Sequence, residues 1–413
     1  MTKKHKEVLN NILLDVSPTK KDISRLKEIQ KQILSKIKIP NAKAVVGGSG
    51  AKNTWLKNTH DIDIYVKFNH SIYSKKSDEL SNILHKHLKK SFPRISRVHG
   101  SRDYFQINFQ GNTIEIVPIL AITNAKQAKN ITDFSFHHVK YVNAQTKKKP
   151  KLANEIRLAK VFAKANKFYG AESYIKGTSG YVLEILVSKY GSFQKFIENA
   201  SKWKSTTTIG KIKDAEKLNW AKKLSPLIVI DPVQPDRNTA AALSREQYNN
   251  IIKSSKRFLK SPSEALFEEQ PININKLKKK GKLTIIEVQP VKGKRDVSGA
   301  KALKAFEFIN KHSNEYEVID SIFDYNEILT TYYIVTKKNK IPIDYKHYGP
   351  PTDNKKALIQ FKKSNKSPIK TDRKLKKYYV IKKRKTNDIR NHIKDLLQME
   401  EVTSRVKSIV LLN

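Results

Sequence analysis

The chain has 413 residues, 38% of them hydrophobic, which exceeds the needs of one core and suffices for two or three domains. It has no cysteine, which excludes a disulfide scaffold and thiolate metal sites and fits a reducing compartment. Its 82 Lys and Arg against 38 Asp and Glu give a net charge of +44, which attracts polyanions such as nucleic acids, although a lysine-rich proteome would give the same excess. No run approaches the roughly 20 apolar residues of a membrane span, so a soluble cytoplasmic protein is expected.

The first part of the chain is predicted to mix helices and strands. Asp22 is expected to cap the first helix, and Gly111-Asn112 is expected to form the turn of a hairpin. Helical spacing and polar–apolar alternation together predict the order helix, strand, strand, helix and a strand pair. These elements fall at residues 22–37, 44–48, 61–68, 77–92 and 104–120.

After about residue 142 the sequence pattern changes from mixed helices and strands to mainly helical spacing. A basic linker containing Pro150 is predicted to lead into a helix that ends at Gly170, and two further helices are predicted to break at Gly191. A third region begins near residue 271, with predicted strands on either side of a helix. The last stretch of about 60 residues is dense in lysine and ends in two helical patterns.

Asp61 and Asp63 lie in a predicted strand with only Ile62 between them, so their side chains should share one face of a sheet. Two like charges on a half-buried face repel each other, unless a divalent cation neutralises both. Carboxylates suit Mg²⁺, and two such ions about 4 Å apart would serve nucleotidyl transfer. Glu115, a single acid in an apolar strand, would complete the site if its strand lies alongside. A solvated strand edge with an outward-facing glutamate is the plainer alternative.

Gly48-Ser49 precedes Asp61 by about a dozen residues. Small residues let the backbone approach a phosphate closely, and a serine hydroxyl can bind the terminal phosphates of a nucleotide. An ordinary turn would contain the same pair. Together with the later acids, however, the spacing resembles that of the polymerase β-like nucleotidyltransferases.

A more specific resemblance follows from "GSGAKNTWLKNTHDID", residues 48–63. This stretch is similar to the signature of the archaeal-type (class I) CCA-adding enzymes, and Thr54-Trp55-Leu56 separates that family from most other members of the superfamily. The resemblance covers roughly residues 20–400 in the family's order. Its further blocks are "FHH" (136–138), "NEIRLAKVFAKANKFYGAE" (154–172), "GTSGYVLEIL" (177–186), "YGSF" (190–193), "IDPVQPDRNTAAALS" (230–244) and "YGPP" (348–351).

The resemblance implies a multidomain α+β enzyme. A polymerase β-like catalytic head would span residues 1–142, a largely helical neck for nucleotide recognition 143–270, and a basic α/β body with a helical tail for tRNA 271–413. It further implies template-independent addition of C, C and A to the tRNA 3′ end. The reaction would use CTP and ATP, two Mg²⁺ ions, and release pyrophosphate.

By the same resemblance, Asp61, Asp63 and Glu115 would be the catalytic, metal-binding acids, although the family usually has an aspartate at the third position. Lys52 stands where an arginine is usual, which keeps the charge but loses the bidentate fork. Taken singly, these and the remaining residues would equally fit ordinary helix, core or loop roles. The expected nucleotide-binding residues are Gly48, Ser49, Lys52, His137, Lys160, Tyr169 and Arg237, the last reading the incoming base.

Basic segments near the C-terminus interleave cations with Phe361, Tyr378 and Tyr379. Such surfaces bind phosphates and stack on bases, so the implied partner is tRNA, through its acceptor stem and 3′ end, with no membrane and with a homodimer left open. Two competitors remain: a related enzyme that makes poly(A) or only part of CCA, and a tRNA-binding protein whose catalysis has lapsed. The basic segments are 278–282, 292–296, 355–366 and 374–388.

Overall fold

The computed structural model describes residues 2–59 and 61–412 and divides the chain into two units, Met1–Pro271 and Ile272–Asn413. The three-part division into head, neck and body is finer than this and stays a prediction. Helix α6, Ser135–Lys148, runs across the expected boundary after residue 142. Within the described residues, no helix is both long enough and apolar enough to span a membrane.

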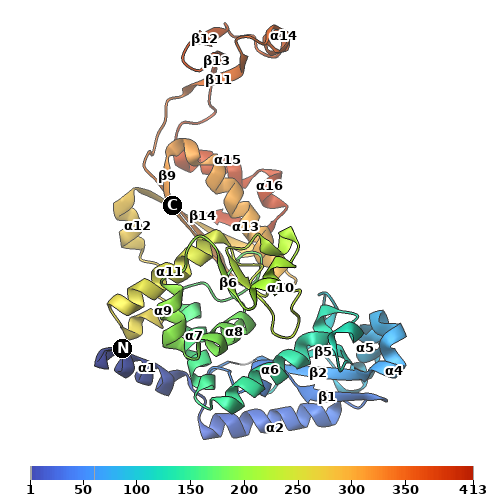
Figure 1. Ribbon diagram of the computed structural model, residues 1–413. Helices are drawn as coiled ribbons and strands as arrows, with labels where there is room; N and C mark the ends of the chain where they lie inside the picture. The colour runs from blue at the N-terminus through green and yellow to red at the C-terminus, as the bar shows by residue number, and fades with distance from the viewer. Residues whose placement is uncertain (1, 60, 413) are drawn as a thin grey trace. The chain divides into compact units, whose positions relative to one another are not determined.

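The first unit contains a five-stranded sheet in the order β1-β2-β5-β4-β3. Figure 1 labels its strands β1, β2 and β5. Strands β2 and β5 pair in parallel, and the other neighbouring strands pair antiparallel, so the sheet is mixed. The strands are β1 Ala42–Val46, β2 Asp61–Asn69, β3 Ser96–Val98, β4 Tyr104–Phe109 and β5 Asn112–Ala121. Helices α2 Lys20–Lys36, α4 His70–Tyr73 and α5 Leu80–Ser91 accompany it.

One face of this sheet is buried under α2 and α5. The alternate residues of β2 from Ile62 to Phe68 form a core with Ile29 and Ile33 of α2 and with Leu84 of α5. Because side chains alternate along a strand, this burial leaves the aspartates of β2 on the opposite face. The predicted sharing of one face by these two side chains is therefore confirmed.

Two local predictions in this region need correction. Asp22 does not cap α2; Thr19 is the N-cap, and Asp22 closes a capping box from the third helical position. The hairpin between β4 and β5 turns at Gln110-Gly111, where both residues have positive φ, one position earlier than expected. Asn112 instead pairs with Phe109 in the ladder.

The helical remainder of the first unit has its own core, built by α1, α7, α8, α9 and α11. Its centre is aromatic, with Phe162, Phe193, Phe258 and Phe267 in mutual contact. The elements are α1 Lys3–Val16, α3 Gly48–Lys52, α7 Leu152–Ala165, α8 Gly180–Tyr190, α9 Phe193–Ala200, β6 Thr207–Ile209, α10 Ile212–Glu216, β7 Leu227–Val229 and α11 Arg245–Lys260.

The helix boundaries here test where the sequence predicted helices to begin and end. Gly191 ends α8 in the left-handed conformation, as expected from its position between two helical patterns. The first part of the stretch read as a basic linker, residues 146–148, is the end of α6, and the helix expected to reach Gly170 already ends at Ala165. The basic composition concealed the helical continuation, because lysine is a good helix former on an exposed face.

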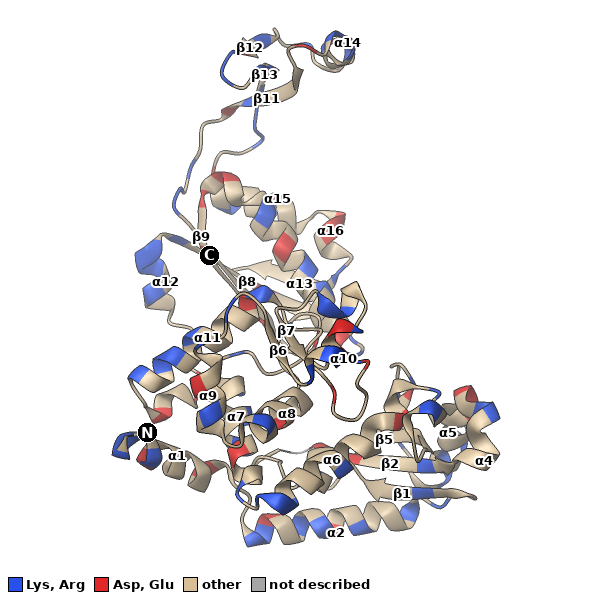
Figure 2. Cartoon of the chain, viewed as in Figure 1, with Lys and Arg blue, Asp and Glu red and all other residues tan. Residues whose placement is uncertain are grey.

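The second unit contains a four-stranded sheet in the order β14-β8-β10-β9 and a three-stranded sheet in the order β11-β13-β12. The closing strand β14 was not anticipated in the predicted helical tail. Lysines gather on α12 (Figure 2). The elements are α12 Ile274–Lys280, β8 Lys282–Pro290, α13 Arg295–His312, β9 Val318–Asp324, β10 Thr330–Thr336, β11 Asp344–Pro351, α14 Lys355–Ser364, β12 Lys370–Asp372, β13 Lys377–Lys383, α15 Ile389–Leu397, α16 Glu400–Thr403 and β14 Val406–Leu411.

Candidate active site

Three carboxylates lie on the open face of the mixed sheet. Asp61 and Asp63 alternate with buried Ile62 and Ile64 along β2, and Asp63 stands directly beside Glu115 in the parallel ladder with β5. The structure therefore brings the three predicted acids together on two neighbouring strands. Glu115 also accepts a hydrogen bond from Gln106 Nε2 at 2.8 Å, which holds its carboxylate over β4.

Helix α3 begins directly against Asp63. Gly48, its first residue, has φ +50°, and a Cβ placed there would lie 1.6 Å from Asp63 Oδ2. A Cβ on Gly47 would meet the ring of Tyr65 at 2.6 Å, and the Tyr65 hydroxyl accepts a hydrogen bond from the Gly48 N–H at 3.3 Å. Only glycine permits this approach, so the start of α3, with Ser49, lies next to the acids.

The acids influence one another's ionisation. Burial, followed by the negative charge of Glu115, raises the pKa of Asp63 to about 6. Burial also raises the pKa of Glu115, and Asp61 adds to the effect. Hard oxygen ligands that raise one another's pKa values fit a divalent cation, which would remove the repulsion. Among residues 2–59 and 61–412, however, no group of three or more His, Cys, Asp or Glu side chains forms a ready-made metal cluster.

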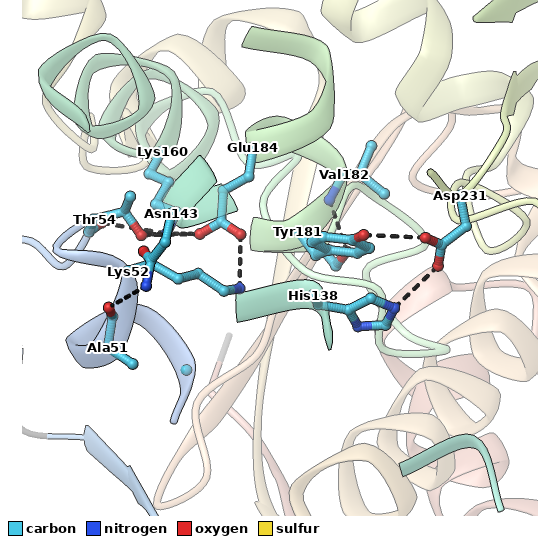
Figure 3. Close-up of polar contacts among 12 residues, drawn as sticks. Ala51, Lys52, Thr54, His138, Asn143, Lys160, Tyr181, Val182, Glu184 and Asp231 are labelled. Carbon is cyan, nitrogen blue, oxygen red and sulfur yellow. Dashed lines mark hydrogen bonds and ion pairs between the residues drawn. The ribbon is translucent and has the colours of Figure 1, made fainter. Parts of the chain in front are cut away.

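A buried network is centred on Glu184 of α8 (Figure 3), and its lysines are close enough to Asp63 that their charges oppose the rise in the pKa of that residue. Its Oε2 accepts from Lys52 Nζ at 2.8 Å, and its Oε1 accepts from Lys160 Nζ at 2.8 Å and from Thr54 Oγ1 at 2.9 Å. Burial alone would raise the pKa of Glu184, but Lys160 and Lys52 outweigh it and lower this pKa to about 2. Two ammonium groups thus share one carboxylate, which leaves a net positive charge near Asp63.

Arg157 of α7 fastens the segment after α3. Its Nε donates to the carbonyl of Trp55 at 2.9 Å, and its Nη2 donates to the carbonyl of Asn53 at 2.7 Å. Together with Thr54, which bonds both Glu184 and Lys160, these contacts bind residues 53–55 to two helices of the helical core. The threonine and tryptophan of the signature thus join the sheet to that core.

Asp231 gathers a second polar cluster. Its Oδ2 lies 3.1 Å from Nε2 of His138 and 3.3 Å from Nη1 of Arg237, and its Oδ1 accepts from the Tyr181 hydroxyl at 3.0 Å. The His138 ring stacks on Tyr181 with centroids 4.1 Å apart (Figure 3). Although burial opposes it, the hydrogen bond from His138 and the charges of His138 and Arg237 lower the pKa of Asp231.

The expected residues do not all converge. Burial lowers the pKa of His137, and the charges of Lys140, His138 and Lys67 lower it further. Tyr169 belongs near the acids, because burial first and then carboxylates that include Asp63 raise its pKa. The structure therefore joins Lys52 and Lys160 through Glu184 and places Arg237 in the Asp231 cluster, whose Tyr181 ring centroid lies 5.4 Å from Lys52 Nζ. The role expected for His137 stays a prediction.

Sequence reasoning missed the residues that organise both clusters. Glu184 is a single acid in the apolar run "GYVLEILV", the same signal that drew attention to Glu115. Asp231 follows the buried strand "LIVI", which is a strong position for a functional carboxylate. His138 was not singled out because the family resemblance assigned the nucleotide-binding role to its neighbour His137.

Comparisons with known proteins agree with this geometry. Residues 23–116, which contain the sheet strands with the three acids, match the family "Nucleotidyltransferase domain". Residues 154–268, which contain α7, α8 and the Asp231 loop, match "tRNA nucleotidyltransferase, second domain". A solved structure of a cytoplasmic RNA terminal U-transferase superposes with a TM-score of 0.52 at 16% identity, over 66% of this chain and 100% of that one, which supports the fold alone.

The fold and the acidic face define a nucleotidyltransferase. The chain is 34% identical over 382 residues to a CCA-adding enzyme of Nanoarchaeum equitans, covering 89% of this chain and 91% of that protein. It is 30% identical to a CCA-adding enzyme of Methanococcus maripaludis, over 86% of this chain and 84% of the relative. The chain therefore belongs to the archaeal-type CCA-adding enzymes, and the resemblance seen in the sequence is confirmed.

Proposed function

We propose that this protein adds C, C and A to the 3′ end of tRNA, using CTP and ATP without a nucleic-acid template. The observation that carries the proposal is the carboxylate trio of β2 and β5 beside the glycine-led start of α3, in a chain of this family. In the reaction, the terminal tRNA hydroxyl attacks the α-phosphorus of the nucleotide, and pyrophosphate leaves. Such transfer depends mainly on positioning and charge neutralisation.

Asp61, Asp63 and Glu115 are the residues that would hold Mg²⁺, which when bound neutralises phosphate charge and polarises the reacting oxygens. Ser49, on the first turn of α3, would bind the phosphate end of the nucleotide. The net positive charge of Lys52, Lys160 and Glu184 would favour the same end, at a site from which bulk water is partly excluded.

Arg237 would read the base edge of the incoming nucleotide. The Asp231 carboxylate accepts from one nitrogen, Nη1, of its guanidinium group, which has further donors on its other nitrogens that would meet a base. A planar donor group held by a buried acid suits discrimination by hydrogen bonding, since a wrong base would leave its donors unpaired in the complex. Tyr181 and His138 would hold that acid in place.

The basic surfaces of the second unit would bind the tRNA acceptor stem, and a tRNA substrate is consistent with a cytoplasmic location. Lysines of α12 and α14, together with β13, supply cations, and Tyr378 and Tyr379 lie on β13 among them. Lysine-rich surfaces with interleaved aromatic rings combine phosphate contacts with stacking. Assembly into a homodimer is not part of this proposal.

The deciding experiment incubates the protein with tRNA lacking CCA and with each nucleotide in turn, followed by sequencing of the 3′ end. We expect complete CCA with CTP and ATP together, and C residues alone with CTP. Asp61→Ala or Asp63→Ala should abolish incorporation while tRNA binding remains. Runs of A or a single added C would contradict full CCA addition, and activity of these variants with ample Mg²⁺ would contradict the proposed metal site.

A further inference from the structure

Trp220 stands out among the three tryptophans of the chain. Trp55 and Trp203 are partly buried, whereas the Trp220 side chain is 74% exposed. Ile212 and Leu224 of the same segment are 70% and 69% exposed. Exposed apolar surface that is contiguous marks interaction sites, and three large exposed side chains on one short segment make this segment a candidate.

The segment that carries Trp220 is folded, so its exposure is a fixed property. Ala215 and Leu218 are buried in a small core with Ile228 and Ile230. The side chain of Asn219 caps the 3₁₀ turn Trp220–Lys223 by accepting from the Lys222 N–H at 3.0 Å. The chain therefore holds the indole ring outward on a supported turn.

The surroundings of the ring are cationic. Residues 211–224 contain five lysines against Asp214 and Glu216. Cations around an exposed aromatic ring fit a single-stranded nucleic acid, whose bases stack and whose phosphates need counter-charges. A second copy of this chain fits less well, because it would bring the same lysines together. The lysines are Lys211, Lys213, Lys217, Lys222 and Lys223.

This surface adjoins the loop that holds Arg237. Asn238 Nδ2 donates to the Lys222 carbonyl at 2.9 Å, and Lys222 Nζ donates to the carbonyl of Asp236. Arg237, which lies between these two loop residues, contacts Asp231. The turn that carries Trp220 is therefore bonded to the loop that carries Arg237, the proposed base-reading residue. An RNA strand lying on Trp220 would pass close to this loop.

We propose that the segment 211–224 is a binding surface for the single-stranded 3′ end of tRNA, with a base stacked on Trp220. The inference rests on the proposed function for the identity of the RNA. It adds a contact for the primer strand that lies outside the carboxylate site and the Arg237 cluster. The binding free energy of this contact would come from base stacking on Trp220, and the lysines would add a salt-dependent contribution through the phosphates.

The test measures binding of a tRNA transcript lacking CCA to the full chain and to Trp220→Ala, Trp220→Tyr and Leu14→Ala. Stacking on one base predicts about 10-fold weaker binding for Trp220→Ala, with little change for Trp220→Tyr, which keeps a ring. Leu14 is a matched control because it is 78% exposed on α1. The affinity loss should be similar at low and high salt, since stacking releases no counterions.

Fluorescence supplies a direct readout, since a stacked base should quench the exposed indole of Trp220. Quenching by the transcript that disappears in Trp220→Tyr supports the proposal. Unchanged affinity and quenching in the variants would overturn it, as would loss of self-association by Trp220→Ala with unchanged RNA binding. If the unaltered protein does not add CCA but RNA still quenches Trp220, the proposed function would be refuted and the RNA-binding surface at 211–224 would be supported.

Discussion

Glu184→Gln offers a sharp test of the buried network because it keeps the side-chain shape and removes the charge that two lysines share. The amide oxygen could still accept from Lys160, but the amide nitrogen would meet the ammonium of Lys52, which lies 2.8 Å from the replaced oxygen. Two buried ammonium groups would then lack a counter-charge. Removing one partner of a buried pair costs about 3–5 kcal/mol.

The ionisation of Glu184 gives a similar magnitude. The fall of its pKa from 4.5 to about 2 corresponds to about 3 kcal/mol of folding stability at neutral pH. Because the pKa is lowered in the folded protein, this stabilisation is full above about pH 4.5 and is lost as the pH falls toward 2. The advantage of the unaltered protein over Glu184→Gln should shrink over the same interval.

Denaturant unfolding followed by tryptophan fluorescence measures the effect. All three tryptophans lie in the first unit, so the signal reports that unit alone. Glu246→Gln is the control: Glu246 is exposed on α11, and its replacement should change the free energy of unfolding by less than about 0.5 kcal/mol. Equal stability of Glu184→Gln and the unaltered protein at pH 7 would refute the reasoning.

Three further predictions concern the same region and the RNA. Gly48→Ala should remove activity and destabilise the first unit by more than the ~1–3 kcal/mol of positive-φ strain, because its Cβ would strike Asp63. The control is Gly111→Ala, where a Cβ meets nothing within 4 Å, and thermal unfolding should show the cost of the positive-φ strain alone. Arg157→Lys should cost about 1.5–3 kcal/mol and raise the KM for nucleotide, since lysine cannot reach both carbonyls; an unchanged KM would contradict this. The affinity for tRNA should fall steeply with salt, and a flat log–log dependence would refute a phosphate-based interface.

The sequence predicted the sheet face well because strand alternation is a local property. Once Ile62 and Ile64 are assigned to the core, Asp61 and Asp63 must point the other way. The placement of Glu115 beside Asp63 needed a strand pairing that periodicity cannot supply, and the family resemblance provided it. Local reasoning was weaker at turns and caps, where a shift of one residue moved the turn from Gly111-Asn112 to Gln110-Gly111.

The buried polar clusters around Glu184 and Asp231 could not be predicted from the sequence, for a physical reason. The family resemblance assigned Lys52 and Lys160 to nucleotide binding, but their common partner Glu184 lies 132 and 24 residues away along the chain. Only the packing of α3, α7 and α8 shows that one carboxylate serves both. His138, which contacts Asp231, is likewise 93 residues from its partner along the chain.

The attachment of residues 53–55 to α7 has a consequence for how the reaction centre responds to distant change. Arg157 and Lys160 of α7 bond the stretch directly after helix α3, so a shift of α7 should carry α3 with it. A substitution beneath α7, remote from any nucleotide, would then be felt at Ser49 as a small displacement. In such an enzyme, substitutions in the supporting helices will weaken substrate binding as readily as substitutions of residues that contact the substrate.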